Sequence, residues 1–202
     1  MSKNTNKIRP AIEDSLQGLA FWMGYRNTIC HEYIFNEYSL VEEFSFLLKS
    51  LLGKEYTIKR EEPYSKHFSK IKGGKMDLFI TDKDGKEKYA VIEAKRWRVK
   101  DITNQKGEKE ERYITDNEIE RDIIRLAKVK KGDNDIPCFF ILISERARPA
   151  EFVGENGKAV KKEFKKKVEN LEYSTRILKA SASFEKKENA YYCCLVEILK
   201  KV

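Results

Sequence analysis

The chain has 202 residues, with 41 lysines and arginines against 33 aspartates and glutamates, and a formal net charge of +8. Its length suits one domain that covers residues 1–202. Hydrophobic residues make up 41% of the chain, which is enough to form a core. No apolar run reaches the roughly 18 residues of a membrane-spanning helix, and no apolar stretch follows the basic start, so we expect neither a membrane partner nor a secretion signal. The excess of basic over acidic residues favours a polyanionic partner, most commonly nucleic acid.

The first part of the chain predicts two helices. Residues 9–26 place apolar side chains at helical spacing, namely Ile12, Leu16, Leu19, Ala20 and Met23. Ser39 is expected to cap the second helix, because Glu42 follows three residues later and completes a capping box. That helix extends to residue 52, and Gly53 is expected to end it.

Three strands are expected next. They cover residues 56–62, 75–81 and 88–97, and the turn residues 82–85 join the second strand to the third. This spacing indicates a meander of antiparallel strands. Residues 98–116 are polar and lysine-rich without an apolar period, so a long loop is expected there.

Helices and strands alternate in the rest of the chain. A helix is expected over residues 116–131 with Gly132 at its end, and the continuous apolar run 136–144 is typical of a strand buried on both faces. A lysine-rich helix over 159–172 and a last strand over 190–199 complete the series. The order predicts an α/β fold with a mixed central sheet flanked by helices.

The residues that indicate chemistry lie in the second and third expected strands. Asp77 is followed, after fifteen residues (78–92), by Glu93, Ala94 and Lys95. Because side chains alternate along a strand, Glu93 and Lys95 point to the same face, and Asp77 lies across the hairpin from them. Two carboxylates are hard oxygen ligands for Mg²⁺, and a lysine beside them can stabilise the charge that develops on a phosphate.

This pattern resembles the signature of the PD-(D/E)XK, or restriction-endonuclease-like, nuclease superfamily, with Met76 in place of the family's proline. The family core is a helix, three antiparallel strands, a helix and a fourth strand. The expected elements over residues 39–144 follow the same order, so the resemblance implies a restriction-endonuclease-like core with N- and C-terminal additions.

The resemblance also implies a role for each motif residue. Asp77 and Glu93 are expected to bind the metal together with the backbone carbonyl of Ala94, and Lys95 is expected to be the catalytic lysine. Mg²⁺ is the implied cofactor, and Mn²⁺ is expected to substitute for it.

The family often adds an acidic residue from the first core helix, and two adjacent candidates exist here. Glu43 projects nearer the edge of the apolar stripe, whereas Glu42 faces away and has a capping role. Glu43 is therefore preferred as a catalytic residue, with Glu42 as the alternative.

Several basic residues are candidates for phosphate contact. The favoured ones are Arg96, Arg98 and Lys100 directly after the motif, and Arg125 and Lys128 on the helix that follows it. The lysines of 161–167 could also bind phosphates, but a solvent-exposed helix face explains their presence equally well.

Cysteine and histidine usage gives little support to other chemistries. Cys30, Cys138, Cys193 and Cys194 form no CxxC pair, which favours buried thiols in a reducing cytoplasm over disulfides or a zinc site. The two histidines, His31 and His67, are too few to support a histidine-based centre.

The leading hypothesis is therefore a cytoplasmic, Mg²⁺-dependent endonuclease that cleaves DNA, of a restriction or phage-defence type. A non-catalytic nucleic-acid-binding protein that keeps the fold is the rival class. Resolvase-like, repair or RNA-cleaving activity is a further alternative. Many relatives act as dimers, so a homodimer stays open.

Overall fold

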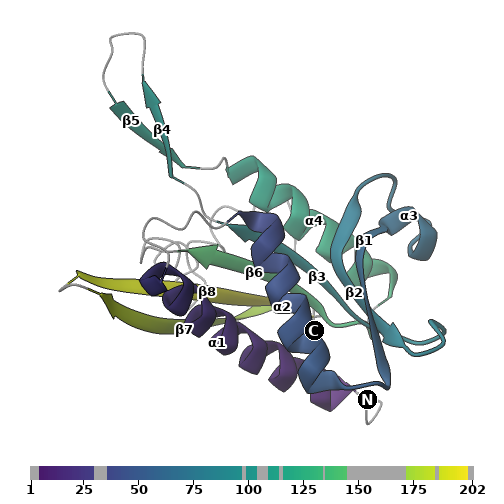
Figure 1. Ribbon diagram of the computed structural model, residues 1–202. Helices are drawn as coiled ribbons and strands as arrows, with labels where there is room; N and C mark the ends of the chain where they lie inside the picture. Colours follow the sequence, from purple (N-terminus) through teal and green to yellow (C-terminus); the bar gives the residue numbers. More distant parts are fainter. Residues whose placement is uncertain are drawn as a thin grey trace.

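A computed structural model gives the fold and describes residues 5–29, 36–96, 99–103, 109–113, 116–133, 135–144, 172–184 and 187–199 (Figure 1). The helices in these ranges are α1 (Thr5–Ile29), α2 (Glu37–Leu52), α3 (Tyr64–His67) and α4 (Asp116–Gly132). The strands are β1 (Tyr56–Pro63), β2 (Lys75–Asp82), β3 (Lys88–Arg96), β4 (Val99–Thr103), β5 (Lys109–Tyr113), β6 (Cys138–Ser144), β7 (Glu172–Phe184) and β8 (Lys187–Leu199).

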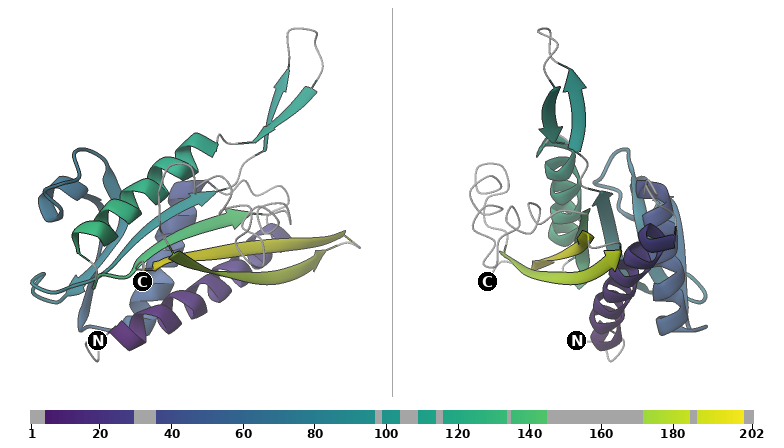
Figure 2. Two further views of the ribbon diagram at one scale, coloured as in Figure 1. Left: turned by 180° about the vertical axis from the view of Figure 1, so that it is seen from behind. Right: turned by 60° about the vertical axis from the view of Figure 1, so that its left-hand side comes forward.

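Six of these strands form one mixed sheet in the order β1-β2-β3-β6-β8-β7. Neighbouring strands are antiparallel except β3 and β6, which run parallel and have α4 between them in the chain. Strands β4 and β5 form a separate hairpin that projects from the body (Figures 1 and 2). The predicted mixed α/β class, with helices beside a central sheet, is confirmed.

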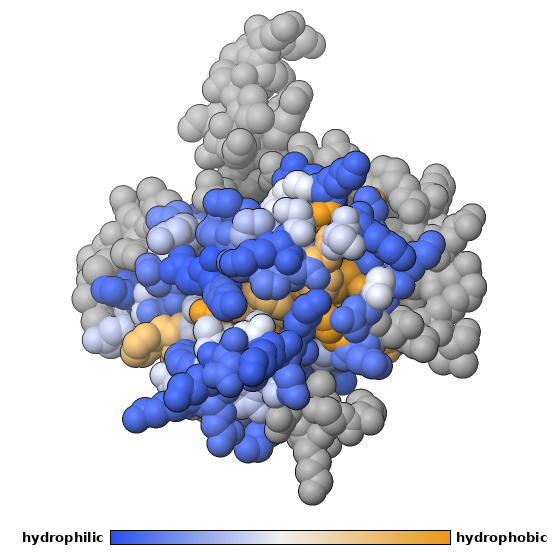
Figure 3. All heavy atoms as spheres, turned by 90° about the vertical axis from the view of Figure 1, so that its right-hand side faces the viewer, coloured by the Kyte–Doolittle hydropathy of each residue, from blue (hydrophilic) through white to orange (hydrophobic). Residues whose placement is uncertain are grey.

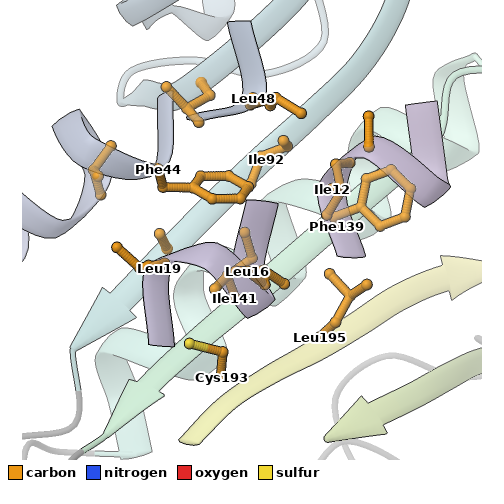
Figure 4. Packing of buried hydrophobic residues seen from close by; sticks show 14 of the residues in the cluster. Ile12, Leu16, Leu19, Phe44, Leu48, Ile92, Phe139, Ile141, Cys193 and Leu195 are labelled. Atoms are coloured by element: carbon orange, nitrogen blue, oxygen red, sulfur yellow. The ribbon is translucent and has the colours of Figure 1, made fainter. Parts of the chain in front are cut away.

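One face of the sheet is covered by α1 and α2, and the other by α4 (Figure 2). Strands β3, β6 and β8 turn alternate side chains toward α1 and α2, where they pack with the apolar stripes of the two helices. Figure 4 labels Ile12, Leu16 and Leu19 from α1, Phe44 and Leu48 from α2, Ile92 from β3, Phe139 and Ile141 from β6, and Cys193 and Leu195 from β8. This is the larger of the two apolar clusters among the described residues.

The α4 face holds the second apolar cluster. Phe79 of β2, Val91 of β3 and Tyr64 of α3 pack there with the apolar stripe of α4. Because Val91 points to this face, Glu93 and Lys95 point to it as well. The α4 face therefore combines apolar packing with the charged end of β3.

Helix α2 begins earlier than the sequence predicts. Its N-cap is Asn36, whose Oδ1 accepts a hydrogen bond from the backbone N–H of Ser39 at 2.7 Å. The predicted cap at Ser39 is therefore wrong, because asparagine is an equally strong capping residue and Ser39 already lies inside the first turn. This shift brings Glu37 into the helix, while Gly53, with a φ of 78°, ends it as predicted.

Two expectations for the second half of the chain also change. The predicted loop after β3 contains the β4–β5 hairpin, in which Val99 pairs with Tyr113, and backbone pairing of this kind needs no apolar period. Strand β7 is not predicted at all. The expected helix over 159–172 lies outside the described residues except for Glu172, which begins β7.

Figure 3 shows a face of the molecule on which most residues are hydrophilic and surround a central band of hydrophobic ones. In the described ranges no helix has both the length and the apolar character needed to cross a membrane.

Candidate active site

Asp77 and Glu93 lie side by side on neighbouring strands. The antiparallel register of β2 and β3 pairs Leu78 with Ile92, which places Asp77 opposite Glu93. Oδ2 of Asp77 accepts a hydrogen bond from the backbone N–H of Ala94 at 2.7 Å, and each of the two carboxyl groups influences the pKa of the other. Glu93 is only 2% exposed, whereas Asp77 is half-buried. The structure thus brings together the two acids that the sequence assigns to one site.

Burial governs the protonation of this pair. Burial, followed by the charges of Asp77 and Asp122, raises the pKa of Glu93 to about 9. Burial also raises the pKa of Asp77, against the lowering effect of the Ala94 N–H. Two ionised carboxylates this close in a poorly solvated place repel each other. With its pKa raised to about 9, Glu93 keeps a proton at neutral pH.

Tyr64 supplies a hydrogen-bond donor to Glu93. It is the first residue of α3, the short helix between β1 and β2, and it is completely buried. Its hydroxyl donates to Oε1 of Glu93, and its backbone N–H donates to the carbonyl of Gly74 at 3.2 Å. Burial raises the pKa of Tyr64 above its ordinary value, so the phenol keeps its proton. Nothing in the sequence singles out Tyr64, because a lone tyrosine after a strand belongs to no motif.

Lys95 lies between two carboxylates. Its Nζ is 2.9 Å from Oε1 of Glu37 and 3.4 Å from Oδ2 of Asp122, and its side chain is 14% exposed. Burial alone would lower the pKa of Lys95, but the hydrogen bond and charge of Glu37, with the charges of Asp122 and Asp77, raise it above its ordinary value. Lys95 is therefore an ammonium at every physiological pH and acts as a donor, not as a base.

Glu37 is the carboxylate of α2 that reaches this cluster. Its Oε1 accepts from Lys95, and its Oε2 accepts from the backbone N–H of Arg96 at 3.2 Å. It precedes Leu40 by three residues and Val41 by four, and both of these are buried in the core. Glu37 therefore lies in the sheet-facing stripe of the helix.

The structure thus places Glu37 beside Lys95 where the sequence favours Glu43, and a catalytic role for Glu43 stays a prediction. Glu43 is partly exposed and lies about 120° around α2 from Glu37. Glu42 is 60% exposed and pairs with Arg60 at 3.0 Å. The sequence analysis misses Glu37 because the misplaced cap leaves it outside the predicted helix.

Asp122 is a buried acid of α4 that the sequence analysis also misses. Its side chain is 3% exposed, with Oδ2 facing Lys95 and Oδ1 accepting from Nη1 of Arg125 at 3.0 Å. Asp122 follows Ile119 by three residues and precedes Leu126 by four, so it stands in the apolar stripe of the helix. A charge in an apolar stripe is the signal that could have identified it. Arg125, a predicted phosphate contact, is thereby placed beside the cluster.

The structure gives less support to the other residues that are predicted to contact phosphate. Arg96 is partly exposed at the end of β3, next to Lys95. Lys100 belongs to β4, and Arg98 and the lysines of 161–167 lie outside the described residues.

Lys128 is separate from the cluster. It lines a cavity of about 160 Å³ between α3 and the C-terminal end of α4, together with Lys70 and Lys88. Lys88 is the first residue of β3, so this cavity lies at the opposite end of the strand from Lys95. The structure therefore does not bring Lys128 together with the motif residues.

Three cysteines are buried free thiols, as predicted: Cys138, Cys193 and Cys194. Burial raises the pKa of each thiol, which disfavours the thiolate that a zinc site needs. Cys30 and His31 lie outside the described residues.

The acid pair is the place for the expected metal. Among the residues that the structure describes, no group of three or more His, Cys, Asp or Glu side chains is placed to hold a metal ion. Asp77 and Glu93 form a smaller set, which fits Mg²⁺ because this ion keeps several waters and takes only one or two carboxylates from a protein. A cation there would also replace the proton of Glu93 and offset the repulsion between the carboxylates. Glu37 and Asp122 instead face the ammonium of Lys95.

The cluster thus joins four elements, with carboxyl groups from β2 and β3, an ammonium from β3 and further charged groups from α2 and α4. Carboxylates can hold a divalent cation, while an ammonium and a guanidinium can bind and stabilise phosphate charge. Comparison with protein-family models, with curated proteins and with solved structures gives no match to this chain.

Proposed function

We propose that this protein is a Mg²⁺-dependent endonuclease that hydrolyses DNA phosphodiester bonds. The proposal rests on one observation: Lys95 is held between Glu37 and Asp122, two residues along β3 from Glu93, which lies opposite Asp77. The order of elements from α2 to β6 supports it, because a helix, three antiparallel strands, a helix and a strand resemble the PD-(D/E)XK core.

In this proposal Asp77, Glu93 and the backbone carbonyl of Ala94 hold Mg²⁺. When bound, the ion supplies a water of lowered pKa and offsets negative charge on the phosphate. Glu93 gives up its proton to become a ligand, and the Tyr64 hydroxyl fixes the orientation of its carboxylate. Burial of Glu93 beside Tyr64 keeps bulk water away from that side of the site.

Lys95 acts on the reacting groups directly. Its ammonium donates hydrogen bonds to the attacking water or to the scissile phosphate, where negative charge grows in the transition state. Glu37 and Asp122 fix the direction of the side chain, so little reorganisation is needed when the substrate binds. This preorganisation is the contribution that we assign to α2 and α4.

The rival proposal is a binding protein that keeps the fold without catalysis. The net charge of +8 favours it as much as it favours a nuclease. It does not account for the acid pair, because burying Asp77 and Glu93 together costs stability and a phosphate-binding surface needs cations. The nuclease proposal explains both features.

The biological role that we propose is restriction or phage defence. Resolvase-like, repair and RNA-cleaving activities use the same chemistry, so the substrate distinguishes them. The test is to incubate the pure protein with Mg²⁺ or Mn²⁺ and plasmid, linear, branched and single-stranded DNA, with RNA beside them. Cleavage of DNA that needs the metal is expected; no cleavage of any substrate would overturn the proposal.

Calorimetry with two aspartate variants tests the metal site itself. Asp77→Ala should abolish Mg²⁺ binding and cleavage, whereas Asp84→Ala, an exposed aspartate in the β2–β3 turn, should change neither. Equal Mg²⁺ binding by wild type and Asp77→Ala would remove Asp77 from the ligand set.

A further inference from the structure

Asp122 joins two cations that come from different elements. Its Oδ2 faces the Lys95 ammonium of β3 at 3.4 Å, and its Oδ1 accepts from the Arg125 guanidinium of α4 at 3.0 Å. Oδ1 also lies 3.9 Å from Nε of Arg121, whose side chain is 59% exposed, so Lys95 and Arg125 are the closer of its three cationic neighbours, and the carboxylate is buried. A buried carboxylate between two cations restrains both side chains, because moving either away leaves negative charge poorly compensated.

Gly74 leaves the space that the Arg125 guanidinium occupies. The guanidinium packs so closely on Gly74 that a Cβ there would lie 2.8 Å from both Cζ and Nη2 of Arg125. The preceding residue, Gly73, has a similar backbone, with φ of 71° against 80° for Gly74, but a Cβ there would meet nothing within 4 Å. The lack of a side chain at Gly74 therefore makes room for the guanidinium of Arg125.

We infer that Asp122 and Gly74 are positioning residues that hold Lys95 and Arg125 as one phosphate-binding unit. This inference rests on the proposed phosphodiester hydrolysis. Lys95 donates hydrogen bonds to the phosphate that is cut, and Arg125 binds a phosphate of the neighbouring nucleotide. The substrate class is therefore a polynucleotide, because a mononucleotide offers no second backbone phosphate to Arg125.

The chemistry of the Lys95 ammonium and the Arg125 guanidinium suits their assignment to the cleaved phosphate and to the neighbouring one. A guanidinium has five N–H donors in a planar fork, and the bond to Asp122 involves one of its nitrogens, Nη1. The side chain of Arg125 is 24% exposed, so the fork is accessible from solvent. Glu37 and Asp122 balance the charge of Lys95, and Asp122 balances that of Arg125, before substrate arrives.

The two glycines provide a matched test. Alanine at either position meets the same unfavourable positive φ, but only Gly74→Ala displaces the Arg125 guanidinium. With Ca²⁺ in place of Mg²⁺, binding of a fluorescent DNA duplex should weaken about tenfold in Arg125→Gln and in Gly74→Ala, and by less than about twofold in Gly73→Ala. The double variant Gly74→Ala/Arg125→Gln should bind as Arg125→Gln does. Equal losses in Gly73→Ala and Gly74→Ala would overturn the role of Gly74.

Asp122→Asn tests the shared anchor. It should lower kcat about tenfold or more because Lys95 loses its restraint, while the affinity for Mg²⁺ stays within about twofold. In the Asp122→Asn background, Arg125→Gln should raise KM by much less than it does in the wild type, since the two residues act as a unit. A lower melting temperature with unchanged kcat and KM would show a merely structural role, and lost Mg²⁺ affinity would make Asp122 a metal ligand; either result overturns the inference.

The DNA-binding arm separates this inference from the proposed function. If the wild type binds duplex DNA but cleaves no nucleic acid, the nuclease proposal fails, and the Gly74 and Arg125 variants still report whether Arg125 is a positioned phosphate contact. If those variants bind DNA as the wild type does, the phosphate-binding unit is wrong even where cleavage is observed.

Discussion

Strand β3 places neighbouring residues in opposite environments on the two faces of the sheet. Ile92 points toward α2 and packs in the apolar cluster with Phe44 and Leu48 (Figure 4). Glu93, the next residue, points toward α4 and accepts a hydrogen bond from Tyr64. Both residues are almost completely buried, so the contrast lies in their chemistry and not in their depth.

The two faces therefore contribute differently to the free energy of unfolding. Burying an apolar side chain such as Ile92 contributes about 1.5–3 kcal/mol. Burying the acid pair of Asp77 and Glu93 has the opposite sign, because the two carboxyl groups lose the hydration that they have as ionised carboxylates in the unfolded chain. The α1–α2 face therefore stabilises the fold through apolar packing alone, whereas the α4 face combines an apolar cluster with charged groups whose burial costs stability.

The largest expected effect on stability is on the apolar face. Phe44→Ala removes a fully buried ring from the main cluster and should lower the free energy of unfolding by about 3–5 kcal/mol. Phe46→Ala, on the same helix but 68% exposed, should change it by less than about 0.5 kcal/mol. Chemical denaturation of both variants checks this, and equal losses would contradict the packing assigned to α2.

The next largest expected effect is the pH dependence of stability that Glu93 of β3 causes. The pKa of Glu93 is raised to about 9 from an ordinary value of about 4.3, so its proton stabilises the fold at low pH. That stabilisation is lost as the pH rises through about 9, because the unfolded chain has already released the proton. Without metal, the stability of the wild type should therefore fall relative to Glu93→Gln between about pH 5 and about 9.

Denaturant titrations of both proteins in EDTA across this pH range make the measurement. Glutamine keeps the shape of the protonated acid and can still hydrogen-bond to Tyr64, so the variant should remain folded. Parallel stability curves for the two proteins would mean that Glu93 is ionised in the metal-free protein.

A smaller effect separates two acids of α2. Glu37→Gln should reduce the rate of DNA cleavage about tenfold, because Lys95 loses an ionic partner but keeps Asp122. Glu43→Gln should leave the rate unchanged within about twofold, since Glu43 lies on another side of the helix. A larger loss in Glu43→Gln than in Glu37→Gln would support the assignment made from the sequence.

The central motif is predictable because it depends on local rules. Alternation along a strand puts Glu93 and Lys95 on one face, and a hairpin turn brings Asp77 across from them. The alternation follows from the sequence spacing alone, whereas the exact register of Asp77 against Glu93 also depends on the irregularity between Ile80 and Thr81. The predicted class of fold follows in the same way from the order of apolar periods.

The supporting residues are harder to predict, for different physical reasons. Glu37 depends on which of two capping residues starts α2, a choice that the sequence leaves open at Asn36 and Ser39. Asp122 is visible as a charge in an apolar stripe, but its partners come from another element. Tyr64 depends only on tertiary packing, since α3 carries it to Glu93 from 29 residues away along the chain.

The most direct measurement is plasmid nicking by Lys95→Ala at fixed Mg²⁺, beside DNA binding in Ca²⁺, which takes the same oxygen ligands in a looser geometry. Lys95→Ala should lose turnover by roughly 100-fold or more while keeping Mg²⁺ binding and most of its affinity for DNA. Lys83→Ala, an exposed lysine in the β2–β3 turn, should match the wild type in both assays. If neither wild type nor Lys95→Ala cleaves any DNA or RNA, the nuclease function is contradicted, and equal cleavage by both would place the activity at another site.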